Sequence, residues 1–230
     1  MTNNNPKDNQ KLSARPISVD VETSGIDPKI NALLSIGAVT GEIGKPGYSE
    51  FYVEICPPEG LKIEEKAMNV NGLDIETLKA SGKSEKEAME AFIAWTKQTI
   101  DWTPLGQNPA FDLGFIREAC NRNGLKSPFP ARSIDLHSVA VSVMAAKGGY
   151  PVKPSWHDPA GCHTDTELDD ILMYVGLPRR KGSHNALDDA KLELEAWQRL
   201  VRYLYRLVHP ETVGKIKLTA DLKKSPLYKA

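Results

Sequence analysis

Cysteine is scarce in this chain, and no long apolar run occurs in it. The three cysteines, Cys56, Cys120 and Cys162, are odd in number and far apart, so we expect reduced thiols in a cytoplasmic protein rather than a disulfide scaffold. No apolar stretch approaches the roughly 20 residues that a membrane-spanning helix needs, so no membrane partner is expected. The first residues, MTNNNPKDNQK, lack the apolar segment of a signal peptide.

An excess of charge of either sign is also missing. The 230 residues include 29 basic and 30 acidic side chains, for a formal net charge of −1. A protein that coats nucleic acid is usually basic, so this balance argues against a non-catalytic duplex binder. It does not argue against an enzyme with an acidic metal site, because bound cations supply part of the positive field.

The pattern of apolar residues predicts one domain between two tails. Residues 1–14 are predicted to be a disordered polar tail, residues 15–210 one folded domain, and residues 211–230 a Lys-rich tail. Strands are expected at 17–22, 32–40, 48–55, 103–107 and 132–135, and helices at 63–72, 84–100, 109–124, 136–149, 166–177 and 185–208. The stretch 150–164 is expected to be a loop. Strands that come first and then alternate with helices indicate an α/β fold with a mixed sheet.

Two carboxylates lie on one face of the first predicted strand. Asp20 and Glu22 are two residues apart, so their side chains point the same way. Carboxylates that point together repel each other unless a cation lies between them. Taken alone, the pair fits equally well a solvent-exposed face of an edge strand.

Two predicted helices each carry an aspartate in the first turn. Asn108 is expected to cap a helix that starts at Pro109, which places Asp112 there. Asn185 can cap a helix that starts at Ala186, which gives Asp189 the same position. A carboxylate near the positive end of a helix stays ionised easily and can face a metal ion. Taken alone, each aspartate could simply complement the helix dipole.

His184 lies just before the last predicted helix, free to approach these acids. Histidine is the side chain best suited to take a proton from water near neutral pH. A surface histidine that precedes a helix is the alternative for this residue alone.

In order and spacing, these pieces resemble the three motifs of the DEDDh superfamily, the DnaQ-like 3′–5′ exonucleases. The matching segments are DVETSG at 20–25, NPAFDLGFI at 108–116 and HNALDDA at 184–190. The resemblance covers roughly residues 16–205 and implies a ribonuclease H-like fold with a five-stranded mixed sheet flanked by helices. Two departures concern the substrate more than the activity. Many relatives have an acid or amide in place of Ser35 and a histidine in place of Gln107.

The resemblance implies that four carboxylates bind two divalent cations, Mg²⁺ or Mn²⁺, which prefer oxygen ligands. These carboxylates belong to Asp20, Glu22, Asp112 and Asp189. His184 would be the general base, and nucleoside 5′-monophosphates would be released one at a time from 3′ ends. Thr23, Gly25 and Asn108 match positions near the terminal nucleotide.

The sequence leaves the substrate and the partners open. The substrate could be DNA or RNA, and its 3′ end could be single-stranded or frayed. The chain could act alone, as a homodimer, or with a polymerase or repair partner. One alternative function is metal-dependent hydrolysis of small nucleotides. Another is a non-catalytic nucleic-acid-binding module of the same fold, which predicts the loss of a catalytic residue, whereas all five are present.

One loop carries a second set of metal-ligating residue types, which could in principle hold zinc. Their spacing matches no common structural zinc site, so a surface or substrate-facing loop is the favoured interpretation. The four residues are His157, Cys162, His163 and Asp165.

Overall fold

A computed structural model describes residues 15–155 and 160–209. Its elements in chain order are β1 (Ile17–Thr23), β2 (Leu33–Thr40), β3 (Ser49–Glu54), α1 (Glu65–Asn71), α2 (Ile75–Ser81), α3 (Glu85–Thr96), β4 (Pro104–Gly106), α4 (Pro109–Arg122), β5 (Ile134–Asp135), α5 (Leu136–Ala146), β6 (Val152–Pro154), β7 (Cys162–Thr164), α6 (Leu168–Tyr174) and α7 (Ala186–Val208). The tails expected at 1–14 and 211–230 lie outside the described residues, as does His157. The domain boundaries at 15 and 210 therefore stay predictions.

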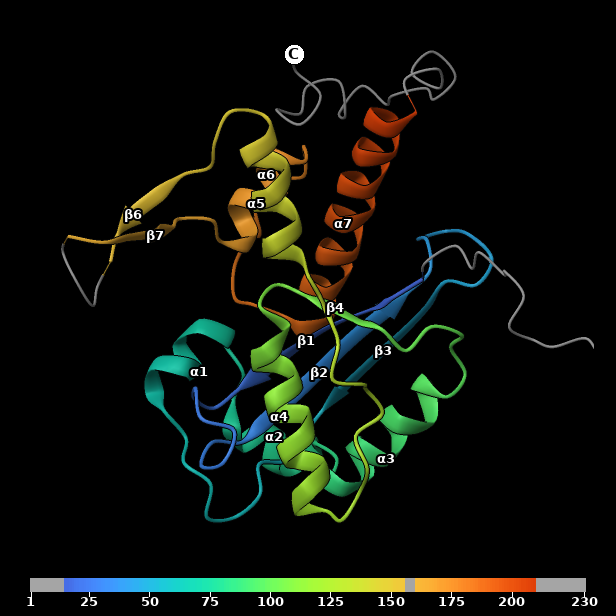
Figure 1. Ribbon diagram of the computed structural model, residues 1–230. Coiled ribbons are helices and arrows are strands. Elements are labelled where there is room, and N and C mark those ends of the chain that lie inside the picture. The colour runs from blue at the N-terminus through green and yellow to red at the C-terminus, as the bar shows by residue number, and fades with distance from the viewer. Residues whose placement is uncertain (1–14, 156–159, 210–230) are drawn as a thin grey trace, which may run out of the picture.

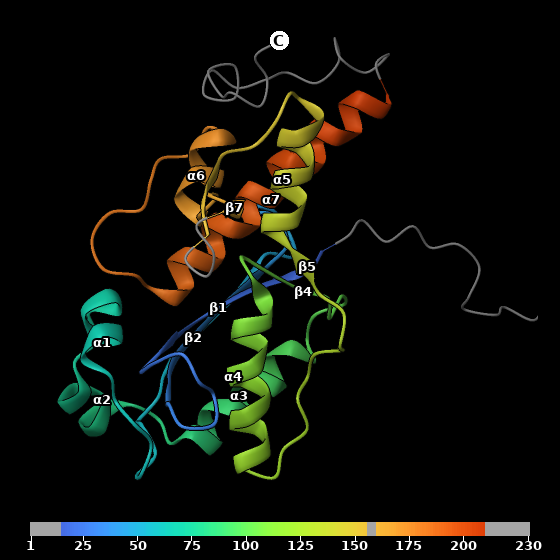
Figure 2. The ribbon, with the colours of Figure 1, turned by 60° about the vertical axis from the view of Figure 1, so that its left-hand side comes forward.

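The centre of the fold is a five-stranded sheet of order β3-β2-β1-β4-β5 (Figure 1). Strands β1, β2 and β3 are antiparallel neighbours, whereas β4 and β5 run parallel to β1. Helices cover both faces of the sheet (Figure 2). The expected α/β fold with a mixed sheet flanked by helices is confirmed.

Each face of the sheet has its own hydrophobic core. On one face, Val19 and Val21 of β1 pack with Phe92 of α3 and Phe115 of α4. On the other, helices α5, α6 and α7 form a second core, to which α7 contributes the apolar stripe that includes Trp197. Because β1 lies in the middle of the sheet and is mostly buried, the alternative of a solvent-exposed edge strand for Asp20 and Glu22 is wrong.

Glycine at position 37 allows α7 to approach the sheet closely. A Cβ atom there would lie 2.1 Å from the backbone carbon of Ala186 in the first turn of α7, far inside van der Waals contact. The side chain of Asn185 caps this helix by accepting the N–H groups of Leu187 and Asp188. The first turn of α7, which carries Asp189, is therefore fixed directly over the central strands.

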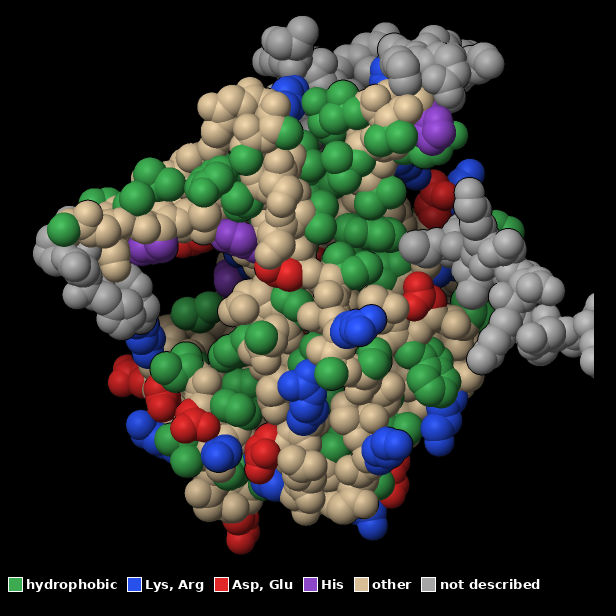
Figure 3. Space-filling model, in the orientation of Figure 1, with side chains coloured by type: hydrophobic (Ala, Val, Ile, Leu, Met, Phe, Trp, Pro, Cys, Tyr) green, Lys and Arg blue, Asp and Glu red, His purple; other side chains and the backbone are tan. Residues whose placement is uncertain are grey.

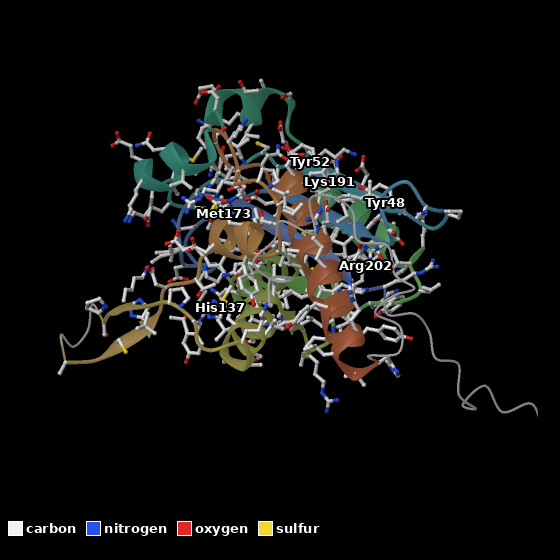
Figure 4. The ribbon with its side chains drawn as sticks, turned by 90° about the horizontal axis from the view of Figure 1, so that it is seen from above. Tyr48, Tyr52, His137, Met173, Lys191 and Arg202 are labelled. Carbon is white, nitrogen blue, oxygen red and sulfur yellow. The ribbon has the colours of Figure 1, made fainter. Side chains whose placement is uncertain are left out.

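Ion pairs tie the flank of α7 to the antiparallel half of the domain. Nζ of Lys191 lies 2.9 Å from Oε2 of Glu50, and Nη2 of Arg202 lies 2.9 Å from Oε1 of Glu42. Figure 4 shows Lys191 and Arg202 on the side of α7 that faces Tyr48 of the β2–β3 region. Such exposed pairs contribute little stability each, so the apolar stripe holds the helix.

None of the helices within 15–155 and 160–209 has the length and apolar surface required to span a membrane.

Two features were not expected from the sequence. The first is helix α2, which fully buries only Leu78 and therefore shows no helical period of apolar residues. Its start is capped by Asp74, whose side chain accepts the N–H of Thr77. The predicted loop at 150–164 instead contains the hairpin β6–β7, which projects from the body in Figure 1. Strands β6 and β7 have three residues each and show no alternation of buried and exposed side chains by which they could be recognised.

Candidate active site

The five residues expected to be catalytic line one cavity of about 470 Å³. They come from three segments far apart in the sequence. They are Asp20, Glu22, Asp112, His184 and Asp189. Figure 3 shows a hollow on this side of the molecule, between α1 and the β6–β7 hairpin, with histidine side chains at its edge. We call the four carboxylates the acid cluster.

Burial and mutual repulsion act together on the two acids of β1. Burial raises the pKa of Glu22 to about 8, and the charges of Asp189 and Asp112 add to it, whereas Arg180 opposes the shift. Burial also raises the pKa of Asp20 well above its ordinary value, and the negative charge of Asp112 raises it further. Carboxyl groups with such pKa values hold protons unless positive charge is supplied.

Asp112 lies where the sheet splits. Strand β4 pairs with β1 only through Pro104 and Leu105, so further along β1 no described strand is its partner on that side. The N–H of Val21 donates instead to Oδ1 of Asp112 at 3.1 Å. Burial raises the pKa of Asp112 to about 7, opposed by hydrogen bonds from backbone N–H groups. The short strand thus makes room for a carboxylate at the centre of the sheet.

Asp189 and His184 meet Glu22 at the start of α7. Asp189 is buried in the first helical turn, and His184, two residues before Ala186, has 37% of its side chain exposed. Potential ligand atoms of Glu22, His184 and Asp189 all lie within 4.8 Å of one another. The backbone N–H of His184 donates to the carbonyl oxygen of Val70 at 3.3 Å, which links this loop to α1.

The three residues expected near the terminal nucleotide also line the cavity. The hydroxyl of Thr23 donates to the carbonyl oxygen of Gly25 at 2.7 Å. A Cβ atom at Gly25 would lie 2.2 Å from Nδ2 of Asn31, so the turn leaves no room for a side chain. Asn108 stands before α4 in the left-handed region, with φ of 58°, and its side chain makes no capping hydrogen bond. The expected capping by Asn108 is therefore wrong; its N–H donates to Oδ1 of Asp135 at 3.2 Å.

Sequence reasoning missed two charged residues of the site. Glu193 is 1% exposed and accepts hydrogen bonds from Oγ of Ser18 at 3.2 Å and from the N–H of Gln107 at 2.8 Å. Its position four residues after Asp189, on the same helix face, is a signal that could have revealed it. Arg180 lies in the irregular segment before α7, where no periodic pattern marks it.

The donor set suits hard divalent cations. Its four carboxylates offer the oxygen ligands that Mg²⁺ and Mn²⁺ prefer. Oε1 of Glu22 is buried and has no hydrogen-bond partner among the described residues. A buried carboxylate oxygen without a partner is costly, and a cation would satisfy it. The residues present therefore fit a divalent metal site.

A mixed sheet with acids gathered at its split centre is an arrangement suited to phosphodiester hydrolysis. Residues 17–196 match the family model RNase_T, described as exonuclease. The chain belongs to this exonuclease family, and the family assignment suggested by the sequence motifs is confirmed.

Individual relatives agree with this assignment. Ribonuclease T of Photorhabdus laumondii is 32% identical over 198 residues, which cover 81% of this chain and 83% of that protein. Ribonuclease T of Haemophilus influenzae is 31% identical over 137 residues, which cover 54% of this chain and 60% of that protein. Exonuclease I of E. coli, solved with a dT13 oligonucleotide, shares the fold with a TM-score of 0.65 at 15% identity; the match covers 86% of this chain and 43% of exonuclease I.

Proposed function

We propose that this protein is a metal-dependent 3′–5′ exonuclease that releases nucleoside 5′-monophosphates from single-stranded or frayed 3′ ends. The observation that carries the proposal is the meeting of the acid cluster and His184 in one cavity, in a chain of the exonuclease family.

Each residue has a proposed part in hydrolysis. Two divalent cations bound by the acid cluster would supply the Lewis acidity that stabilises charge on the phosphate and on the leaving 3′-oxygen. His184 accepts the proton of the attacking water; its partial exposure to the cavity supports this role. Asp112 keeps its position through the N–H of Val21. Glu193 holds the N–H of Gln107, next to Asn108.

An apolar wall of the same cavity suits the terminal base. Ile26 and Val70 line the cavity and are 80% and 48% exposed, and Phe111 lines it as a half-buried ring. Bases stack on aromatic rings such as Phe111 without sequence preference, and Ile26 and Val70 add apolar contact area. Exonuclease I was solved with dT13 and with dA16, and the ribonuclease T relatives are named for RNA. We infer that single strands of either sugar reach the site.

Two labelled substrates test this function. DNA and RNA oligonucleotides of one sequence, labelled at the 5′ end, are incubated with the protein and Mg²⁺ or Mn²⁺. We expect a ladder that shortens from the 3′ end and stops with EDTA or with Asp20→Asn. If both oligonucleotides stay intact while dinucleotides are cleaved, the protein is a hydrolase of small nucleotides instead.

A further inference from the structure

Arg180 places a fixed positive charge inside the cavity that the roles above do not use. Its Nη1 donates to Oδ2 of Asp189 at 2.7 Å and lies 3.5 Å from Nδ1 of His184. Its Nε and its backbone N–H both donate to Oδ1 of Asp169 in α6, at 3.0 and 3.2 Å. Only 18% of the Arg180 side chain is exposed. A guanidinium stays protonated at any pH at which proteins fold, so this charge is permanent.

The partner of Arg180 is a proposed metal ligand. Oδ2 of Asp189 accepts the guanidinium at ion-pair distance, and Asp189 belongs to the group of residues that could hold a cation. The charge of Arg180 also reaches Glu22, whose pKa it lowers. A divalent cation bound at these two carboxylates would lie within a few ångströms of the guanidinium, where like charges repel strongly because the site is buried.

Asp169 gives Arg180 a second anchor outside the acid cluster. It holds both the backbone and Nε of Arg180, and its pKa is lowered by the guanidinium, against burial, which raises it. If Nη1 released Asp189, the side chain would stay attached to α6 through Nε. The freed Nη1 would remain in the wall of the cavity, where a phosphate that enters the site needs a donor.

From these contacts we propose that Arg180 is an exchangeable counter-ion: it competes with divalent cations for Asp189 and, once displaced, holds the substrate phosphate. The second half of this proposal rests on the proposed exonuclease function, whereas the first half concerns metal binding alone. Arg180 would thus set the metal concentration at which the site fills, and couple filling of the site to capture of the substrate.

Direct metal binding tests the first half without any nucleic acid. Mn²⁺ is titrated into the full chain by calorimetry, and free Mn²⁺ is followed by electron paramagnetic resonance. Arg180→Met removes the charge and keeps an apolar stem, and Arg180→Lys keeps the charge. The matched control is Arg179→Met, since Arg179 is 58% exposed and pairs with Asp170 at 3.5 Å, away from the acid cluster.

We expect Arg180→Met to bind Mn²⁺ at least about tenfold more tightly than the native chain. Arg180→Lys and Arg179→Met should stay within about threefold of it. Unchanged Mn²⁺ binding by Arg180→Met would overturn the proposal, because it would mean that Arg180 does not compete with the cation. Weaker binding would overturn it too, because it would mean that Arg180 merely orients Asp189. Circular dichroism melting checks that each variant is folded, and if Arg180→Met does not fold, Arg180→Gln takes its place in the same titration.

Kinetics at saturating Mn²⁺ test the second half. For a 5′-labelled oligonucleotide, Arg180→Met should raise KM by about tenfold and leave kcat within about threefold. An unchanged KM would overturn the phosphate contact. If the native chain binds Mn²⁺ and Arg180→Met binds it more tightly, but neither cleaves an oligonucleotide, the exonuclease function fails and the competition for Asp189 stands.

Discussion

Replacing Glu22 with glutamine tests whether burial and the neighbouring acids destabilise a charged carboxylate at this position of the fold. The carboxyl of Glu22 has an ordinary pKa of 4.5 in the unfolded chain and a pKa of about 8 in the folded one. As pH rises through this interval, the unfolded chain loses the proton first, so the folded state loses stability between pH 4.5 and 8. The shift corresponds to on the order of 5 kcal/mol at alkaline pH, an upper limit because neighbouring acids and water rearrange.

Glutamine keeps the shape of Glu22 and removes its charge. With EDTA present, we expect Glu22→Gln to raise the free energy of unfolding by about 2–4 kcal/mol at pH 8.5 and by less than about 1 kcal/mol at pH 5. Saturating Mg²⁺ should stabilise the native chain more than the variant, because a ligand has been lost. Hydrolysis should be abolished in the variant.

Urea unfolding followed by circular dichroism measures these differences. Glu90→Gln, on an exposed position of α3, is the control for loss of a negative charge and should change stability little at either pH. If Glu22→Gln were less stable than the native chain at pH 8.5 in EDTA, the proposed destabilisation of the Glu22 carboxylate by burial and by its acidic neighbours would be refuted.

Three further perturbations follow from the geometry. Gly37→Ala forces a Cβ to within 2.1 Å of the α7 backbone; it should lower the free energy of unfolding by about 1–3 kcal/mol in urea and impair hydrolysis by moving Asp189. His184→Ala should lower kcat by about 10²–10⁴-fold and remove the limb of the pH–rate profile that reports the base; an unaltered profile would assign the proton to another group. Asp112→Asn keeps an oxygen for the N–H of Val21, so its melting temperature in EDTA should not fall, whereas Mg²⁺-dependent cleavage should disappear; a variant that cleaves at the native rate would show that Asp112 is not a ligand.

The parts of the fold that could be predicted are those marked by patterns between residues close together in the sequence. Alternation around Asp20 identified β1, and the capping pair Asn108–Pro109 correctly located the start of α4, although the asparagine side chain does not form the cap. The order of strands and helices predicted a mixed sheet, which is the observed one. The short strand β6, whose side chains are mostly exposed, and helix α2, with one fully buried side chain, show no such pattern and were missed.

The site could be predicted as far as its residues belong to periodic elements or recognisable motifs. Asp112 and Asp189 each follow a helix start and His184 precedes one, but these positions alone did not predict a common site. The order and spacing of the three motifs, which resemble those of the DEDDh family, predicted the site in which they meet β1. Arg180 was not, because its contacts with Asp169 and Asp189 depend on the path of an irregular loop. Glu193 was not singled out either, because only the packing of α7 on the sheet places its carboxylate beside Ser18 of β1.

The most direct test of the central claim is the chemistry of the product. A single-stranded oligonucleotide is digested with Mn²⁺ in water enriched in ¹⁸O, and the products are analysed by mass spectrometry, with Asp189→Asn as the control. We predict that the native chain, and not the control, forms nucleoside 5′-monophosphates that each carry one ¹⁸O on the phosphate. Nucleoside 3′-phosphates, or equal product from Asp189→Asn, would contradict it.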